Sequence, residues 1–296
     1  MALPGDERFR RFSDRKTREA VEARIHPLVT VDTGPSRPGL RGIGNDWTRQ
    51  FYGGDFHLTE PPAVQPCVSL VFVQSREGNT VAGNPEELGG GPTDKHLIYE
   101  GLSRVAADAV LAGAATATGD EVLFSVWHPE LVALRYALGL ARHPAQIVVS
   151  NEGRVDFDAL LFNVPELRVL VLAGAACRWR CHDAFARRPW ITVVNLEPGG
   201  LAASLRQLRR DHAIQRISAI GGRTIASSLV QAGAVQDLCL TTSARSAGEP
   251  NTPFYSGPRA PSLELIVRKR GTDSAAPIVV EHFAIRTVSP GSPTVV

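Results

Sequence analysis

The sequence predicts an α/β fold built on a mostly parallel sheet. Three observations lead to this prediction. Short apolar runs recur from Pro66 onward, helical patterns separate them, and several runs are apolar on both faces, as central strands of a parallel sheet must be. The chain has 296 residues, 43% of them hydrophobic, which is enough for a sizeable core.

The predicted strands fall into two groups. Six apolar runs form the first group, at residues 67–73, 108–113, 146–150, 168–174, 191–196 and 216–222. Helical patterns stop after Gly233, and three more strands are predicted at residues 234–243, 262–270 and 277–286. We expect antiparallel pairing in this last group.

Four helices are predicted between the strands. Thr93 is placed to cap the first helix, and Pro129 stands at the first position of the second, where its missing N–H leaves no hydrogen bond unmade. The apolar stripes of the four helices are Leu97, Ile98 and Leu102; Leu131, Leu134 and Leu138; Leu201, Leu205 and Leu208; and Ile225, Leu229 and Val230.

Residues 1–62 have a different texture from the rest of the chain. Charged patches alternate there with stretches rich in Pro and Gly, which indicates an extension preceding one domain at residues 63–296. Its aromatic run at residues 47–58 is expected to pack against the core, or alternatively to close over a site or a dimer seam.

Charge and composition exclude several kinds of partner. The 32 basic and 30 acidic residues are mixed along the chain and give a formal net charge of +2, so no basic field for nucleic acid exists. No run approaches the roughly 18 to 20 apolar residues that span a bilayer, and the first residues lack the apolar core of a secretion signal. We expect a cytoplasmic protein with a small-molecule substrate and neither nucleic acid nor membrane as partner.

The cysteines predict neither a disulfide framework nor a metal site. Cys67, Cys177, Cys181 and Cys239 are too few and too scattered for a framework of disulfides. Cys177, Cys181 and His182 form a Cys-x3-Cys-His cluster, but a fourth ligand at a sensible spacing is missing. We therefore expect reduced, structural thiols.

The strongest local signal is the stretch ISAIGGRTIASSLVQAG at residues 217–233. A strand runs into Gly221 and Gly222, which let the backbone approach a ligand closely, and a helix with free amide donors begins at once. Arg223 and Thr224 add a charge and a hydroxyl at the helix start. The pattern predicts a phosphate-binding turn, and an ordinary tight turn is the alternative.

A second signal is the stretch ADAVLAGAATATGDE at residues 107–121. The strand ends in residues without bulk, which leaves space for a flat ligand beside the sheet, and Thr116 and Asp120 follow as polar contacts. The alternative is a core hydroxyl at Thr116 and a capping or loop carboxylate at Asp120. Two strands of a parallel sheet can end at one edge, so both signals are expected around one ligand.

These two segments resemble the reductase domain of bacterial riboflavin biosynthesis, whose fold is like that of dihydrofolate reductase. In that family the first strand reads roughly D-A-[IV]-x-x-G-x-x-T-x-x-x-D, which residues 108–120 fit in register. The family's glycine turn, followed by a helix that ends in Q-A-G-x-V-x-[DE]-L, is matched by residues 222–238. The resemblance covers about residues 66–286. It implies a three-layer fold, with helices on both faces of a mostly parallel sheet and antiparallel C-terminal strands.

The resemblance implies an NADPH-dependent oxidoreductase. Gly222 to Ile225 fall on the family's diphosphate loop, and Ser150 and Asn151 fall near the adenosine and its 2'-phosphate. Val73 would contribute its backbone beside the nicotinamide, ahead of a segment with Glu77 where the family has Asp. The cofactor contacts implied in all are Val73, Thr116, Asp120, Ser150, Asn151, Gly221, Gly222, Arg223, Thr224 and Ile225. A homodimer is also implied, with residues 262–286 as its seam, whereas the catalytic residues stay unknown.

The substrate is less well defined by the resemblance. Arg104 fits the family arginine that contacts the phosphorylated pyrimidine, although an arginine at a helix end is also typical of a solvated cation. Two other substrate-binding residues of the family are missing. Ile220 stands where the family has Glu, and Trp127 falls near the position of the phosphate-binding arginine. Trp127 either stacks on a flatter, less charged ligand or packs under the following helix.

We expect hydride transfer to a small heterocyclic or sugar-bearing substrate. One alternative is the family's own ribosylaminopyrimidine phosphate, bound by other residues. Another is a non-catalytic NADPH-binding or regulatory protein on the same fold.

Overall fold

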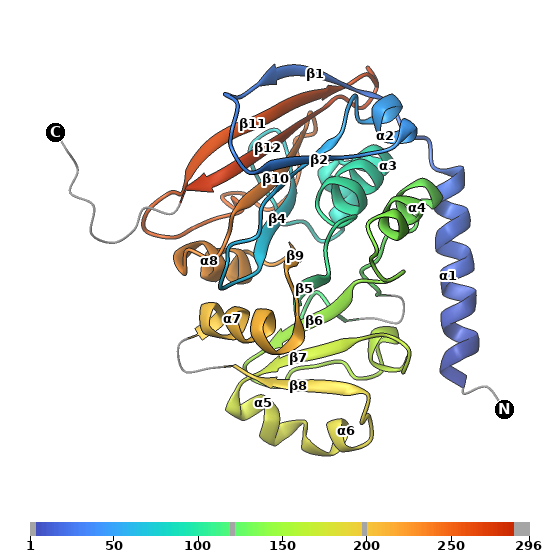
Figure 1. The fold of residues 1–296 in the computed structure, drawn as a ribbon, viewed down its shortest axis with the longest axis vertical. Helices are drawn as coiled ribbons and strands as arrows, with labels where there is room; N and C mark the ends of the chain where they lie inside the picture. The colour runs from blue at the N-terminus through green and yellow to red at the C-terminus, as the bar shows by residue number, and fades with distance from the viewer. Residues whose placement is uncertain (1–3, 119–121, 197–199, 287–296) are drawn as a thin grey trace.

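The protein folds around a ten-stranded sheet with helices on both faces (Figure 1). The structure is a computed structural model that describes residues 4–118, 122–196 and 200–286. The strand order is β1-β11-β12-β10-β4-β9-β5-β6-β7-β8, and a separate two-stranded sheet pairs β2 with β3. The predicted α/β fold class is confirmed.

All nine predicted strands are present, with ends within three residues of the predicted ones. The strands of the large sheet are β1 Leu28–Thr33, β4 Cys67–Gln74, β5 Ala109–Gly113, β6 Ala145–Ser150, β7 Val169–Ala173, β8 Ile191–Asn195, β9 Arg216–Ile220, β10 Asp237–Ser243, β11 Ser262–Gly271 and β12 Ile278–Arg286. The small sheet consists of β2 Leu40–Ile43 and β3 Phe56–Thr59. Strands β10, β4, β9, β5, β6, β7 and β8 run parallel, whereas β12, β11 and β1 continue the sheet antiparallel, as expected for the tail.

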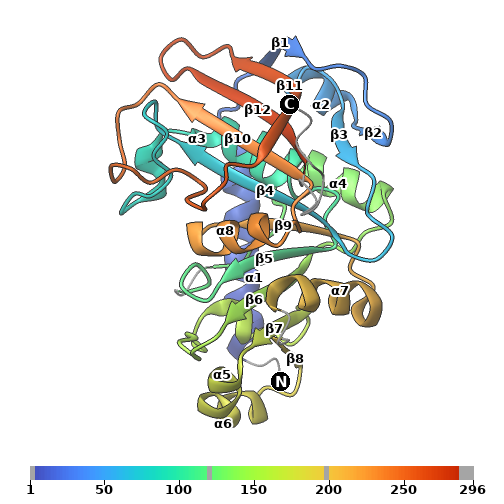
Figure 2. The same cartoon turned by 90° about the vertical axis from the view of Figure 1, so that its left-hand side faces the viewer.

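The helices lie in two layers (Figures 1 and 2). They are α1 Pro4–Glu22, α2 Asp46–Phe51, α3 Gly91–Thr93, α4 Pro129–Ala137, α5 Ala175–Arg180, α6 His182–Ala186, α7 Gly200–His212 and α8 Arg223–Gln231. Shorter or wider turns are η1 Pro85–Leu88, the π-helix η2 Asp94–Leu102, and η3 Leu160–Phe162. The four predicted helices correspond to α3 with η2, α4, α7 and α8, and Pro129 begins α4 as predicted.

The predicted cap at Thr93 is wrong. The helical run begins at Gly91, three residues earlier than a cap at Thr93 predicts, with Gly90 as its N-cap and Gly91 at φ 65°, so Thr93 has helical backbone angles and cannot cap. Its hydroxyl instead accepts a hydrogen bond from the backbone N–H of His26, at 3.0 Å. The turn at Gly90 and Gly91 therefore starts the helix before the position that the sequence predicts.

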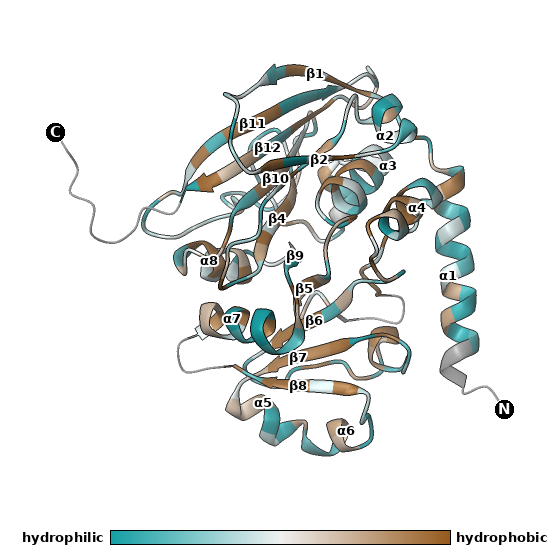
Figure 3. Ribbon diagram, viewed as in Figure 1, coloured by the Kyte–Doolittle hydropathy of each residue, from teal (hydrophilic) through white to brown (hydrophobic). Residues whose placement is uncertain are grey.

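Three apolar clusters hold the layers together (Figure 3). The first packs α7 and α8 on one face of the sheet, and includes Leu205 and Leu229. The second packs η2 and α4 on the other face, and the third joins α1, η3 and α5 to the sheet. Strands β5 and β7 contain no polar side chain, and β7 is brown along its length in Figure 3, because helices cover the sheet on both sides.

The segment before residue 63 is built into this core. β1 pairs antiparallel with the outer edge of β11, and Tyr52 and Phe56 are fully buried in the second cluster. Trp47 of α2 stacks on His128, with ring centroids 4.3 Å apart. The expected packing of the aromatic run against the core is therefore confirmed. In the described parts of the chain, no helix is both long and apolar enough to cross a membrane.

Candidate functional site

The sheet topology predicts a ligand-binding crevice at the carboxyl ends of β4, β9 and β5. The connection from β4 to β5 runs through η2 on one face, whereas the connection from β9 to β10 runs through α8 on the other. Neighbouring strands whose connections leave on opposite faces open a crevice beyond their carboxyl ends, where ligands of α/β proteins bind.

The two sequence signals meet in this crevice. A Cβ atom placed on Gly221 would lie 2.9 Å from Cγ2 and 3.0 Å from Oγ1 of Thr116. Gly113 likewise faces the side chain of Ile225 at 3.5 Å. The Thr116 hydroxyl is half-buried and makes no hydrogen bond to a described residue. Asp120, the second predicted polar contact, lies outside the described residues.

The amino end of α8 has the features of an anion-binding site. Gly221 and Gly222 both have left-handed φ angles, of 68° and 66°, and no side chain caps the helix. Arg223 adds a cation whose Nε is buried without a hydrogen-bond partner. Free amides, a helix dipole and an unpaired guanidinium nitrogen all suit a diphosphate, so these residues fit the cofactor that the sequence implies. Thr224 is exposed and Ile225 half-buried on the same turn.

The predicted adenosine contacts lie two strands away. Ser150 ends β6, and its Oγ accepts a hydrogen bond from the backbone N–H of Gly153, at 3.1 Å. Asn151 is exposed and packs against Gly174, the residue after β7. A Cβ atom placed on Gly174 would lie 2.6 Å from Oδ1 of Asn151. Asn151 thus lies at the same carboxyl edge of the sheet as Thr116 and Gly221.

The segment after β4 is locked to the segment after β10. Glu77, at the position where the family has Asp, accepts hydrogen bonds from the hydroxyls of Ser75 and Ser246, at 2.9 and 2.6 Å. These bonds lower the pKa of Glu77 to about 2, so it stays ionised. Val73 is half-buried, and lies opposite Thr241 in the parallel ladder of β4 and β10.

The two candidate substrate residues are both buried. Arg104 is 7% exposed and donates a hydrogen bond to the carbonyl of Ser125 at 2.7 Å, while its Nε has no partner. Burial lowers its pKa to about 10. Its role as a substrate contact stays a prediction. The Phe12 ring meets the Trp127 ring edge-on, with centroids 5.4 Å apart, and Cζ of Arg142 lies 5.3 Å from the Trp127 ring centroid. Of the two alternatives for Trp127, packing in the core is therefore confirmed and stacking on a ligand is wrong.

One buried acid at this edge was missed from the sequence. Asp94, the first residue of η2, is 4% exposed and accepts a hydrogen bond from the hydroxyl of Thr241 on β10. Desolvation raises its pKa to about 7. An aspartate in the first turn of a helix is a common dipole partner, so its residue type alone carried no signal.

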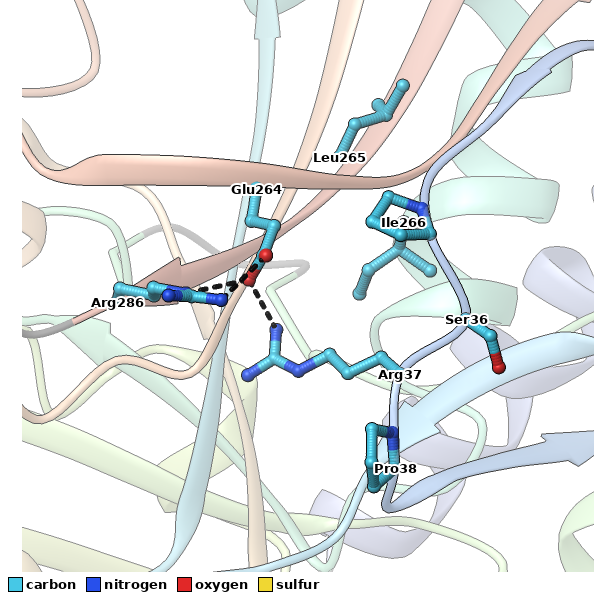
Figure 4. A pocket seen from close by; sticks show the side chains of 8 residues that line it. Ser36, Arg37, Pro38, Glu264, Leu265, Ile266 and Arg286 are labelled. Atoms are coloured by element: carbon cyan, nitrogen blue, oxygen red, sulfur yellow. Dashed lines mark hydrogen bonds and ion pairs between the residues drawn. The ribbon is translucent and has the colours of Figure 1, made fainter.

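A groove of about 480 Å³ lies at the opposite edge of the sheet (Figure 4). It runs between residues 35–38, the first half of β11 and the last residue of β12. Glu264 pairs there with Arg286 at 2.8 Å and with Arg37 at 3.9 Å. None of the predicted site residues lines this groove, so it is separate from the crevice.

Comparison with known proteins decides the family. The sequence matches the RibD C-terminal domain over residues 70–273. The chain belongs to the RibD C-terminal domain family. No curated protein sequence matches it.

Solved structures with the same fold include proteins of this family. RibD from Acinetobacter baumannii superposes with a TM-score of 0.58 at 16% identity, covering 76% of this chain and 59% of that protein. A pyrimidine reductase-like protein from Corynebacterium diphtheriae gives 0.60 at 20% identity, covering 75% of this chain and 92% of that one. The riboflavin biosynthesis reductase of Saccharomyces cerevisiae gives 0.52 at 16% identity, with 76% and 92% covered.

Membership in the RibD C-terminal domain family confirms the resemblance seen in the sequence. The chain spans less than two thirds of the Acinetobacter baumannii protein. The crevice at the carboxyl edge lies within the matched residues, whereas the groove at the opposite edge lies partly outside them.

Proposed function

We propose that this protein is an NADPH-dependent reductase that transfers a hydride to a small heterocyclic or sugar-bearing substrate. One observation carries the proposal: Thr116 and Gly221, more than 100 residues apart, touch at the mouth of the crevice, beside the uncapped start of α8. The family supports the reductase class, and the crevice supports a dinucleotide.

Each part of the crevice has a role toward the cofactor. The amides after Gly222 and the Arg223 guanidinium would hold the diphosphate, and Thr116 would bind a neighbouring polar group. Ser150 and Asn151 would contact the adenosine end, and the Val73 backbone would border the nicotinamide. When bound, NADPH supplies the hydride, and the protein's part is binding, orientation and exclusion of water.

The proposed substrate class follows from two substrate-binding residues of the family that this chain lacks and from one, Arg104, that it keeps. Trp127 is buried where the family has its phosphate-binding arginine, and Ile220 is 6% exposed in the core. A substrate of the family type would therefore need other cationic groups. The family's ribosylaminopyrimidine phosphate remains the closest chemical analogue, and Arg104, with its free Nε, remains the proposed contact.

The first experiment is titration of the protein with NADPH and with NADH, followed by nicotinamide fluorescence. We expect saturable binding with NADPH preferred. Thr116→Val keeps the shape against Gly221 but removes the hydroxyl, and should weaken binding about 3- to 10-fold, as loss of one hydrogen bond does. Thr118→Val is the matched control, because the Thr118 hydroxyl is exposed and, among the described residues, donates a hydrogen bond only to the carbonyl of Ala115. Absence of binding by the wild-type protein would refute the proposal.

The non-catalytic alternative is separated by turnover. A protein that kept the cofactor cradle alone would bind NADPH in this titration but would not oxidise it with pyrimidine, pterin or carbonyl acceptors. NADPH oxidation with any of these acceptors excludes that alternative.

Homodimerisation is proposed from the family resemblance. Because β1 already pairs with the outer edge of β11, two copies would meet through the face of the strands at residues 262–286 rather than by extending the sheet at β11. A monomeric mass in sedimentation at micromolar concentration would contradict this proposal.

A further inference from the structure

Reduction of a polar double bond requires a proton as well as a hydride. The carbon of a C=N or C=O group accepts the hydride, the π electron pair moves to the heteroatom, and the heteroatom takes up a proton. The proposed cofactor supplies only the hydride. A protein group near the nicotinamide, or water, must therefore supply the proton.

The contacts of Asp94 place its carboxyl group near the expected position of the nicotinamide. Thr241 holds one carboxyl oxygen, and Thr241 lies directly opposite Val73 in the parallel ladder. Adjacent strands are about 4.8 Å apart. Asp94 is therefore hydrogen-bonded to the strand next to β4, and β4 carries the Val73 backbone that we expect beside the nicotinamide. The Tyr99 side chain, one turn further along η2, lies near enough to the Val73 backbone for that backbone to oppose the rise in the pKa of Tyr99 that burial causes.

The second carboxyl oxygen of Asp94 faces a turn without side chains. A Cβ atom on Gly90 would stand 2.5 Å from Oδ2, so any larger residue there would collide with it. Gly91 follows with a left-handed φ of 65° and open space where a side chain would stand. Residues 90 and 91 thus place no side chain over this oxygen.

The electrostatic surroundings keep a proton on Asp94 near neutral pH. Desolvation raises its pKa to about 7, and the hydrogen bond from Thr241 opposes this shift. The titratable groups that face it are Tyr99 on η2 and Cys239 on β10, and burial raises the pKa of both, so both are neutral. Among the described residues, no cation pairs with Asp94.

Glu77 is another described carboxyl group, in the segment that follows β4. It is exposed, and its hydrogen bonds to Ser75 and Ser246 lower its pKa to about 2. A carboxylate with so low a pKa carries no proton to donate at neutral pH. Glu77 instead fixes the segment after β4 to the segment after β10.

We propose that Asp94 is the catalytic acid that protonates the substrate heteroatom during hydride transfer. The O–H bond of Asp94 breaks as the new heteroatom–H bond forms, the carboxyl becomes a carboxylate, and a proton from water restores it after product release. This inference rests on the proposed reductase function.

The first test measures protons rather than turnover. Isothermal titration calorimetry at pH 7 in buffers of different ionisation enthalpy gives the number of protons released when NADP⁺ or NADPH binds. The oxidised nicotinamide is positively charged, so beside Asp94 it should lower the carboxyl pKa and release about half a proton more than NADPH does. Asp94→Asn should remove this difference.

The outcomes separate the two proposals. If neither nucleotide binds, the reductase function fails, and the role of Asp94 fails with it. If both bind and release equal numbers of protons in the wild-type protein, or if Asp94→Asn keeps the difference, the role of Asp94 alone is refuted. Asp183→Asn is the control, because Asp183 is 86% exposed on α6.

The second test uses the pH profile of NADPH oxidation with an accepted substrate. The wild-type rate should fall above pH 7 as Asp94 loses its proton, and Asp94→Asn should lower kcat roughly 10²- to 10⁴-fold with NADPH affinity unchanged. Thr241→Val removes a hydrogen bond that lowers the pKa, so it should move the alkaline limb to higher pH. An unmoved limb in Thr241→Val would overturn the assignment, since a purely structural Asp94 predicts no shift.

Discussion

The contact between Gly221 and Thr116 gives the most direct test of the crevice. Gly221→Ala places a Cβ at a φ of 68°, where an L-residue is less stable by about 1–2 kcal/mol. The same Cβ would lie 2.9 and 3.0 Å from two atoms of Thr116, which must shift. We expect a total loss of about 2–3 kcal/mol in the free energy of unfolding.

Two further variants divide this loss into its parts. Gly139 has a similar φ of 73° and nothing within 4 Å of its would-be Cβ, so Gly139→Ala measures the backbone effect alone. Thr116→Ala removes both colliding atoms, and in that background Gly221→Ala should lose only the backbone part. The coupling energy between Thr116 and Gly221 should be about 1 kcal/mol.

Urea denaturation followed by circular dichroism, with linear extrapolation, measures these differences. Gly221→Ala should be less stable than Gly139→Ala in the wild-type background and about equal to it when Thr116 is Ala. Equal losses for the two glycine variants in the wild-type background, or strict additivity in the cycle, would show that Thr116 and Gly221 do not touch. The crevice as described would then be wrong.

Three further predictions concern residues outside the crevice. Burial lowers the pKa of Lys269 to about 8 from 10.5, so between these pH values the unfolded chain binds more protons and stability rises with pH; Lys269→Met should abolish this rise in urea midpoints. Phe12, 5% exposed against Trp127, should lose about 3 kcal/mol of stability on change to Ala, and a loss below 1 kcal/mol would mean that α1 is not docked. Asp108 accepts hydrogen bonds from the backbone N–H groups of Gln215 and Arg216, both at 2.8 Å, so Asp108→Ala should lower the melting temperature but leave NADPH affinity unchanged.

Asp108 shows that a family pattern mixes two kinds of residue. It belongs to the same sequence pattern as Thr116, yet it lies at the amino edge of the sheet, where it fixes the start of β9. Asp237, in the second pattern, lies at the same edge and accepts a hydrogen bond from Thr59 of β3 at 2.6 Å. Spacing in the sequence could not separate these structural residues from those of the crevice.

The strands and most helices could be predicted because their signal is local. The apolar runs of β4 to β12 and the stripes of α4, α7 and α8 follow from the alternation of side chains along a few residues. The two glycines before α8 likewise predicted a turn and an uncapped helix start, because this signal lies within a few consecutive residues. The error at Thr93 arose where Gly90 and Gly91, rather than a polar cap, set the start of the helix.

The tertiary structure alone decided the role of the first 62 residues and of Asp94. β1 has five exposed residues of six and becomes a strand by pairing with β11, more than 230 residues away. Asp94 owes its raised pKa to burial and to Thr241, 147 residues away. The sequence by itself determined what neighbouring residues encode, namely periodicity, turns and caps. Burial, desolvation and cross-chain contact depend on residues far apart in the chain, and only the folded arrangement supplies them.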